Sequence, residues 1–262
     1  MLDFDIKGWM TMIVVDTHTH VGGRYANIED LMLQLDQYGV DKGVLVQYRA
    51  DLPPPGNTDN AYHVHCLTRY PSRLASVGIV DWTQQDALTT LEYWSRQGIQ
   101  GLRLDGDARS PGGDQYAIWK KAAELKTNVS VYNRLDSIPE IVQQCPDLKI
   151  HIEHCGQPSL NGTKILELAR YPNVYVKFSA GGLSAFSKQD YPYIDVQPFV
   201  EQLFHQFGAN RIMYSSDYPS SGKVIGYGKV LYYLLREIST LSWEDKEWVM
   251  GKTALSLWQF TK

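Results

Sequence analysis

Short apolar runs alternate with longer amphipathic stretches about eight times along the chain. Near-continuous apolar runs of this length are typical of buried parallel strands. When strands alternate with helices in this way, each helix crosses back over the sheet and the strands become parallel. The eight predicted strands are 12–17, 43–47, 76–81, 100–104, 129–132, 149–153, 174–178 and 211–215.

The stretches between these runs have helical periodicity. Asn27 is a capping residue, and the stripe behind it carries Ile28, Leu31 and Leu35. Thr83 followed by Asp86 predicts a variant of the capping box. The predicted helices are 27–35, 83–94, 116–125, 138–144, 163–169 and 196–207, with a final helical region from 242 toward 260.

The 262 residues suit one (β/α)8 TIM barrel, which needs roughly 250. We therefore predict an α/β protein with a single barrel domain over 1–262, in which 1–11 form an N-terminal extension. An open doubly wound sheet is the competing fold, and a glycine-rich GxGxxG turn after the first strand would favour it. The sequence has no such turn there.

Composition narrows the class of protein. The formal charge of −4 argues against nonspecific nucleic-acid binding. The three cysteines have no CxxC spacing, so we expect reduced thiols. No apolar run approaches about 18 residues, and the first twelve residues lack the apolar core of a signal peptide. We expect a cytoplasmic protein that binds a small anionic molecule and no nucleic acid or membrane. The oligomeric state and the choice of Met1 or Met12 as the start stay open.

Two histidines close the first predicted strand. In this fold the active site lies at the carboxyl ends of the strands. Side chains alternate along a strand, so His18 and His20 should share a face with Asp16. Two imidazoles at this spacing can bind one metal ion or polarise one carbonyl oxygen.

Asp217 and His154 end two other strands. Asp217 follows the last strand and precedes Pro219, so its carboxylate should face the mouth and can act as a general base. His154 ends the sixth strand, whereas His151 and Glu153 have the opposite parity and should point toward the helices. His63, His65 and His205 lie in helical stretches and should be solvent-facing or satisfied locally.

Cationic and aromatic side chains also gather at the predicted strand ends. Arginine suits bidentate recognition of a carboxylate. Arg103 and Lys177 lie within strands and are the best candidates to bind a substrate anion, because an uncompensated buried charge is costly. Arg24, Arg49 and Arg134 are further candidates, and Tyr132 could donate a hydrogen bond. The aromatic residues of the same loops are Tyr25, Tyr48, Trp82, Tyr132 and Tyr218. The long connection 179–210 begins with two glycines after Ala180, and its first half could form a mobile flap over the site.

These motifs together resemble the amidohydrolase-related family of the amidohydrolase superfamily. The resemblance is strongest to its lactonase branch, which includes 2-pyrone-4,6-dicarboxylate lactonase and sugar-acid lactonases. It rests on five segments that follow one another along nearly the whole chain: Asp16–His20, Gly98–Arg103, His154–Pro158, Val174–Lys177 and Arg211–Pro219.

The resemblance implies that His18, His20, His154 and Asp217 form the active centre. Many superfamily members bind Zn²⁺ through the paired histidines, the aspartate and a histidine that ends the fifth strand. Here the fifth strand supplies no histidine, and Arg103 stands where a metal-bridging lysine would be. We expect no two-metal site. One divalent metal held by His18, His20, Asp217 and His154, or a site that works without metal, both remain open.

The predicted reaction is hydrolysis of a lactone of a sugar acid or of a carboxylated ring. Asp217 would serve as the general base, and the three histidines would polarise the carbonyl, with or without zinc. A metal-dependent decarboxylase of the same superfamily is the alternative. A non-catalytic barrel that binds acids or carbohydrates is a further one. A phosphoesterase of the polymerase-and-histidinol-phosphatase type would need more His and Asp ligands than the seven histidines of this chain offer.

Overall fold

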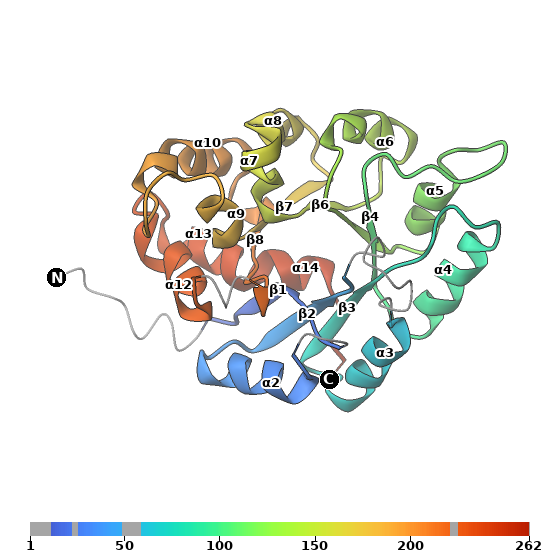
Figure 1. Cartoon of the computed structure of the whole chain (residues 1–262), viewed down its shortest axis with the longest axis horizontal. Helices are drawn as coiled ribbons and strands as arrows, with labels where there is room; N and C mark the ends of the chain where they lie inside the picture. The colour runs from blue at the N-terminus through green and yellow to red at the C-terminus, as the bar shows by residue number, and fades with distance from the viewer. Residues whose placement is uncertain (1–11, 23–25, 49–58, 221–224, 262) are drawn as a thin grey trace.

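The computed structural model describes residues 12–22, 26–48, 59–220 and 225–261 (Figure 1). One sheet contains eight parallel strands in chain order, which confirms the predicted TIM barrel. The strands are β1 (Val15–Thr19), β2 (Lys42–Val46), β3 (Leu74–Gly78), β4 (Gly101–Leu104), β5 (Asn128–Val131), β6 (Ile150–Ile152), β7 (Val174–Phe178) and β8 (Ile212–Tyr214). The extension 1–11 lies outside the described residues.

The barrel closes between β8 and β1, at the mouth of the sheet. Tyr218, beyond the end of β8, forms a parallel bridge with Thr19. His20 N donates to Tyr218 O at 2.7 Å, and Asp217 N donates to His18 O at 2.9 Å. Three candidate site residues therefore lie on the seam that closes the barrel.

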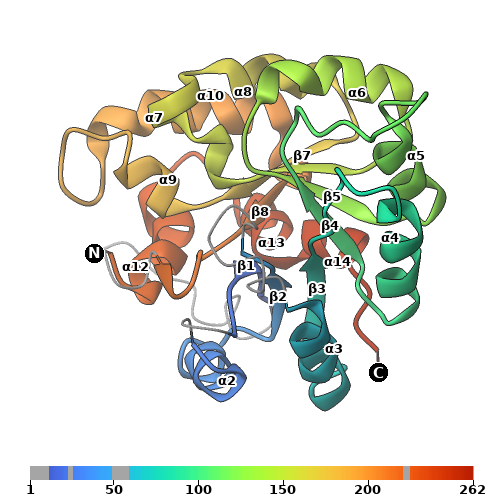
Figure 2. The ribbon, with the colours of Figure 1, turned by 45° about the vertical axis from the view of Figure 1, so that its right-hand side comes forward.

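Helices surround the strands on the outside (Figures 1 and 2). The α-helices are α2 (Ile28–Gln37), α3 (Asn60–Arg69), α4 (Ala87–Arg96), α5 (Ala117–Glu124), α6 (Ile138–Gln144), α7 (Pro158–Asn161), α8 (Lys164–Glu167), α9 (Ala180–Ser184), α10 (Gln197–Phe207), α12 (Tyr227–Tyr232), α13 (Trp243–Glu247) and α14 (Thr253–Leu257). A π-helical turn, η8 (Trp248–Lys252), joins the last two.

Of the two helix starts predicted from capping residues, one is confirmed and one is wrong. Asn27 caps α2, where its Oδ1 accepts from Asp30 N at 2.8 Å, and the predicted apolar stripe is buried. The capping-box variant at Thr83 was wrong. Helix α4 begins later, Asp86 makes no side-chain cap, and the Thr83 hydroxyl donates to Asp81 at 2.6 Å instead. The Asp81 carboxylate also accepts from Thr83 N at 3.0 Å, and such local side-chain bonds compete with the start of a helix, so this capping pattern alone does not decide where a helix starts.

Two separate apolar cores follow from strand alternation. The larger one lies between the strands and the helices, and the smaller one lies inside the barrel around Val15, Val44, Val77 and Trp258. Trp258 packs across Gly101, the first residue of β4, and thus fills the end of the barrel opposite the mouth.

Two expectations from composition can be compared with the structure. Cys66, Cys145 and Cys155 are buried free thiols, as expected. Among the described residues, no helix combines the length and apolar character that a membrane crossing requires.

Candidate active site

The first strand breaks its alternation before it reaches the histidines. Val15 faces the inner core, whereas the Asp16 carboxylate faces outward and accepts from the Tyr227 hydroxyl of α12 at 2.8 Å. The pairing of β1 with β2 shifts register between Asp16 and Thr19. Such a bulge re-aims the side chains beyond it. The expectation that Asp16 shares a face with His18 and His20 was therefore wrong, while both imidazoles lie together at the mouth.

Asp217 brings its carboxylate to these two imidazoles. Its Oδ1 lies 3.2 Å from His20 Nε2 and 3.8 Å from His18 Nε2. Its backbone has the left-handed value φ = 57°, and the Tyr218–Pro219 peptide bond that follows is cis. The carboxylate and the two imidazoles thus share one space at the mouth.

Hydrogen bonding and burial define the state of the paired histidines. His20 Nδ1 lies 2.7 Å from the Val46 carbonyl oxygen, which can only accept, so Nδ1 carries the proton and Nε2 keeps its lone pair in the neutral ring. Burial lowers the pKa of His18 well below its ordinary value, with the Lys177 charge as the next cause. His18 Nε2 lies 3.2 Å from His20 Nε2.

The His18 Nε2, His20 Nε2 and Asp217 Oδ1 atoms are spaced like the ligands of one divalent metal ion. Tetrahedral zinc with ligands at 2.0–2.1 Å separates its ligand atoms by about 3.3 Å. The two imidazole Nε2 atoms and the Asp217 Oδ1 atom are separated by 3.2, 3.2 and 3.8 Å. His18, His20 and Asp217 are thus the residues that could hold zinc. A second group that could do so is His18, Glu153 and His154.

His154 reaches the same space from the end of β6. It opens the short 3-10 turn η3 (His154–Gly156), and its ring centroid lies 4.8 Å from that of His18. The Tyr132 ring meets it edge-on at 5.9 Å. On its other side lies α9, where a Cβ on Gly182 would come within 2.5 Å of the His154 carbonyl oxygen. The first part of the predicted flap is therefore a helix packed against the site, with Leu183 fully buried.

Glu153 and His151 point into the barrel, so the prediction that they face the helices was wrong. Ile150 and Ile152 face the outer core, whereas the His151 ring packs on Trp258 at 5.3 Å between centroids. Parity had been counted from His154, whose φ of 52° takes it out of the strand geometry.

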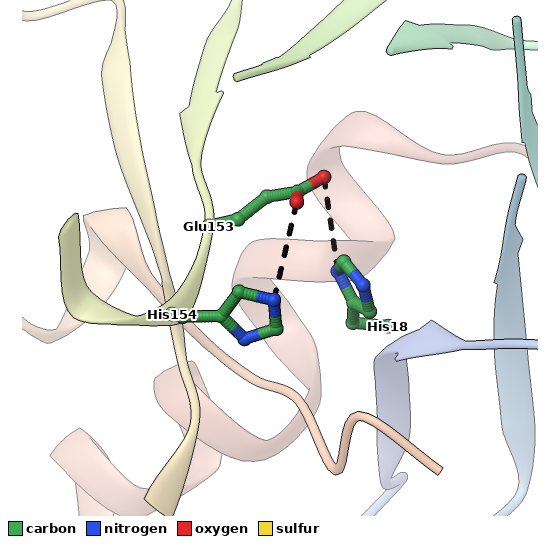
Figure 3. Close-up of side chains that lie close together, drawn as sticks. All are labelled: His18, Glu153 and His154. Atoms are coloured by element: carbon green, nitrogen blue, oxygen red, sulfur yellow. Dashed lines mark ion pairs between the residues drawn. The ribbon is translucent and has the colours of Figure 1, made fainter. Parts of the chain in front are cut away.

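The Glu153 carboxylate faces the His18 and His154 rings and is fully buried (Figure 3). Arg103 donates to both of its oxygens, from Nε at 3.1 Å and from Nη2 at 2.6 Å, and Ser130 Oγ donates to Oε1 at 2.7 Å. Burial raises the pKa of Glu153, but the charges of Arg103 and Lys177 outweigh it and bring the pKa to about 2. Sequence reasoning missed this carboxylate. A buried arginine needs an anionic partner, and that requirement was the available signal.

The predicted cationic residues have different surroundings. Arg103 is paired with Glu153 and also donates to the Gln47 carbonyl at 3.0 Å, with its guanidinium over the Tyr132 ring. Lys177 is fully buried; its Nζ has no hydrogen-bond partner among the described residues, and burial lowers its pKa to about 8. Arg134 is exposed and lies 3.3 Å from Asp107.

The remaining predictions concern arginine, aromatic and histidine side chains. Arg24, Arg49 and Tyr25 lie outside the described residues. The Tyr48 ring packs on His20 at 5.2 Å, and Trp82 and Tyr218 are half-buried against the outer core. His63 is buried with Nδ1 2.7 Å from Ser76 Oγ, and His65 and His205 are exposed, as expected.

A parallel eight-stranded barrel with imidazoles and a carboxylate gathered at the carboxyl ends of its strands has the architecture of a barrel enzyme. The amidohydrolase family model matches residues 15–260, so the chain belongs to the amidohydrolase family. This confirms the resemblance seen in the sequence motifs.

Individual relatives place the chain within that family. It is 27% identical over 213 residues to an L-fucono-1,5-lactonase from Burkholderia ambifaria, covering 74% of this chain and 70% of the relative. A putative 2-pyrone-4,6-dicarboxylic acid hydrolase from Pseudomonas putida has a similar structure, with a TM-score of 0.73, 24% identity, and coverage of 94% of this chain and 97% of the other.

Two further solved structures share the fold. An amidohydrolase from Burkholderia multivorans with bound zinc has a TM-score of 0.72 at 19% identity, covering 94% of this chain and 98% of the other. A 5-carboxyvanillate decarboxylase from Sphingomonas paucimobilis has a TM-score of 0.70 at 12% identity, covering 96% and 100%.

Proposed function

We propose that the protein is a lactonase that opens the cyclic ester of a sugar acid or of a carboxylated ring. The observation that carries the proposal is the position of the Asp217 carboxylate, which lies beside the Nε2 atoms of the two imidazoles at the end of the first strand. Similarity to an L-fucono-1,5-lactonase supports a lactone as the substrate class. Similarity in fold to a putative 2-pyrone-4,6-dicarboxylic acid hydrolase agrees with it.

The chain's own residues supply acid–base chemistry and orientation. Asp217 takes a proton from the water that attacks the lactone carbonyl carbon. It returns that proton to the ring oxygen as the carbon–oxygen bond breaks, and the product is the open hydroxy acid. His154, whose ring centroid lies 4.8 Å from that of His18, would hold the reacting groups by a hydrogen bond.

We further propose that the site takes one divalent metal, with His18, His20 and Asp217 as its ligands. When bound, zinc would polarise the carbonyl and stabilise the negative charge that develops on its oxygen. A zinc-bound amidohydrolase among the solved structures of this fold supports this choice of metal.

The candidates to bind the substrate's anionic group are cationic side chains within or after the predicted strands. Arg103 donates to Glu153 and to a carbonyl, and Lys177 is fully buried, so both support the floor of the site. They and the Tyr132 hydroxyl stay candidates for substrate contact. Arg24 and Arg49, which follow the first and second strands, are the candidates best placed in the sequence to meet a carboxylate.

A panel of sugar-acid and aromatic-derived lactones tests the proposal, with hydrolysis followed by a pH indicator. Protein stripped with a chelator and protein reloaded with zinc are assayed side by side, together with their metal content by mass spectrometry. We expect turnover of at least one lactone, restored by zinc after stripping. Release of CO₂ from aromatic acids without hydrolysis of any lactone would favour a decarboxylase and overturn the proposal.

A further inference from the structure

Asp16 carries a fully buried carboxylate on the outward face of β1, behind the candidate site. Its Oδ1 atom accepts from Ser216 N at 2.9 Å and from His18 N at 3.2 Å. Its Oδ2 atom accepts from the Tyr227 hydroxyl of α12 at 2.8 Å. The reaction proposed above does not use this carboxylate.

The seam between β8 and β1 depends on side chains as well as on backbone pairing. Ladders pair each strand with the next along the chain, whereas β1 meets the segment after β8 through an isolated bridge. Thr17 Oγ1 donates to the Tyr214 carbonyl across this seam at 2.7 Å. Asp16 Oδ1 accepts from Ser216 N across the same seam. Side chains of β1 therefore supply bonds that a ladder supplies elsewhere in the sheet.

The bond from Asp16 acts on the turn that carries the proposed base. Ser216 directly precedes Asp217, whose left-handed φ of 57° persists only where its surroundings hold it. The Ser216 N–H is held by Asp16, and the next N–H, that of Asp217, donates to the His18 carbonyl at 2.9 Å. His18 N donates to the same Asp16 oxygen. One carboxylate oxygen therefore ties the backbone of His18 to the turn that presents Asp217.

Tyr227 holds the carboxyl group of Asp16 in its orientation. The Tyr227 hydroxyl bonds the second oxygen, and its ring packs on Tyr38 and Tyr218 with centroids 5.2 and 6.0 Å apart. Tyr227 is itself buried. The carboxyl group thus has one oxygen for α12 and one for the seam, and it cannot rotate without breaking bonds on both sides.

We propose that Asp16 is a positioning residue, whose hydrogen bonds to Ser216 N and His18 N hold the Asp217 carboxylate at the paired imidazoles. This inference rests on the proposed function, in which Asp217 is the base. In the present arrangement Asp217 Oδ1 reaches His20 Nε2 at 3.2 Å. Without the Asp16 oxygen, two buried N–H groups lose an acceptor, which is costly, and the turn must move to find them other partners.

Crystal structures of Asp16→Ala and Asp16→Asn, freed of metal by a chelator, test the proposal without any substrate. The Asn side chain keeps an oxygen that can accept from both N–H groups and an amide that can donate to the Tyr227 oxygen. The distance from Asp217 Oδ1 to His20 Nε2 should match the parent in Asp16→Asn and lengthen by about 1 Å in Asp16→Ala. An unchanged distance in Asp16→Ala overturns the proposal.

Kinetics on the panel of sugar-acid and aromatic-derived lactones measure the consequence for the reaction. A displaced base slows the chemical step more than it weakens substrate binding. In Asp16→Ala, kcat should fall about 10- to 100-fold while KM stays within about threefold of the parent. Asp16→Asn should restore kcat to near the parent value. An unchanged kcat in Asp16→Ala, or an equal loss in Asp16→Asn, would refute a role as hydrogen-bond acceptor.

Thr17→Val is the matched control. It removes a buried hydrogen bond across the same seam but leaves both N–H groups bonded to Asp16. It should lower the unfolding midpoint and keep both the kcat of the parent and its distance from Asp217 to His20. An equal fall in kcat for Thr17→Val and Asp16→Ala would mean that any weakening of the seam is enough, and the positioning role would be wrong.

The outcomes for the two proposals are separate. If no lactone is hydrolysed, the proposed function fails, while the distance in the crystal structures still decides the role of Asp16. If Asp16→Ala does not fold by circular dichroism, Asp16→Ser replaces it, because the shorter serine side chain cannot reach both N–H groups. The same displacement of Asp217 is expected there, and an unchanged distance overturns the proposal.

Discussion

At the residue scale, two of the four candidate site residues have an unusual backbone. Asp217 and His154 have φ values of 57° and 52°, in the left-handed region that non-glycine residues seldom adopt. Each such residue costs on the order of 1 kcal/mol and persists only where its surroundings hold it. For Asp217 the surroundings are the hydrogen bond to the His18 carbonyl and the turn before Pro219. This geometry directs both side chains into the mouth instead of along the strand.

Asp217→Asn tests the proposed base. The amide keeps the shape of the carboxylate but cannot take a proton from water, so kcat should fall about 10²-fold or more. Steady-state kinetics on whichever lactone the panel identifies measures the effect, and Asp114→Asn, on an exposed loop, is the control. Turnover close to that of the parent would exclude Asp217 as the base.

Glu153 should make stability depend on pH. Its pKa is about 2 in the folded protein, below the ordinary 4.5, so its stabilisation is present above about pH 4.5 and is lost as the pH falls toward 2. Removing the charge leaves Arg103 unpaired and should cost about 3 kcal/mol at pH 7. Urea unfolding of Glu153→Gln and of the parent should show a gap that narrows below pH 4.5.

Asp16 contributes to the pH dependence of stability in the opposite direction. Comparing the parent with the variant cancels this contribution. Burial raises the pKa of Asp16 to about 6, and both proteins share this contribution. Glu140→Gln is the control, because Glu140 pairs with Arg109 at the surface and should change stability little at any pH. A gap that stays constant between pH 7 and pH 3 would contradict the depressed pKa of Glu153.

At the element scale, the site is assembled from short segments just beyond the strands. The bulge in β1 turns His18 and His20 into the mouth, and the turn η3 after β6 turns His154 there. Helix α9, which follows β7, supports that turn through the close approach of Gly182 to the His154 carbonyl. The positions of the imidazoles thus depend on contacts between neighbouring loops.

Gly182→Ala tests this contact. Its new Cβ would lie 2.5 Å from the His154 oxygen, so α9 or η3 must move. We expect a loss of about 1–3 kcal/mol in stability and a fall of tenfold or more in kcat, because a shift of about 1 Å at a reacting group is costly. Gly113→Ala is the matched control, since its Cβ would meet open space. Equal unfolding midpoints and equal kcat for the two variants would refute the role of α9.

At the scale of the whole molecule, the candidate site and the apolar contacts that close the other end of the barrel lie apart. The mouth carries the imidazoles and Asp217, and the opposite end is filled by Trp258 from the C-terminal segment. A substitution at that end removes apolar contacts far from the reacting groups. It should therefore change folding without changing the site.

Trp258→Ala should lower the free energy of unfolding by about 3–5 kcal/mol. While the variant is folded, its kcat and zinc affinity should equal those of the parent. Leu255→Ala on the neighbouring helix α14 is the control, because Leu255 is 37% exposed and its loss should cost little. A Trp258→Ala variant as stable as the parent would show that the Trp258 side chain does not stabilise the inner core.

Sequence alone determined the architecture and four residues around which the site could be built. Eight apolar runs with helical stretches between them, without a glycine-rich turn after the first run, favour a parallel barrel over an open doubly wound sheet, and the strand ends then meet at one mouth. His18, His20, His154 and Asp217 were predicted on that reasoning, and the structure brings them together. Periodicity is a local property, so one chain was sufficient for this part.

Only the tertiary structure decided which way the intermediate side chains point. A bulge at Asp16 and a left-handed residue at His154 each changed the parity of a strand, and no local pattern marks either one. The pairing of Arg103 with Glu153 likewise joins positions fifty residues apart. The cost of an unpaired buried charge is set by the full packed interior, which is why these contacts could not be predicted from local sequence.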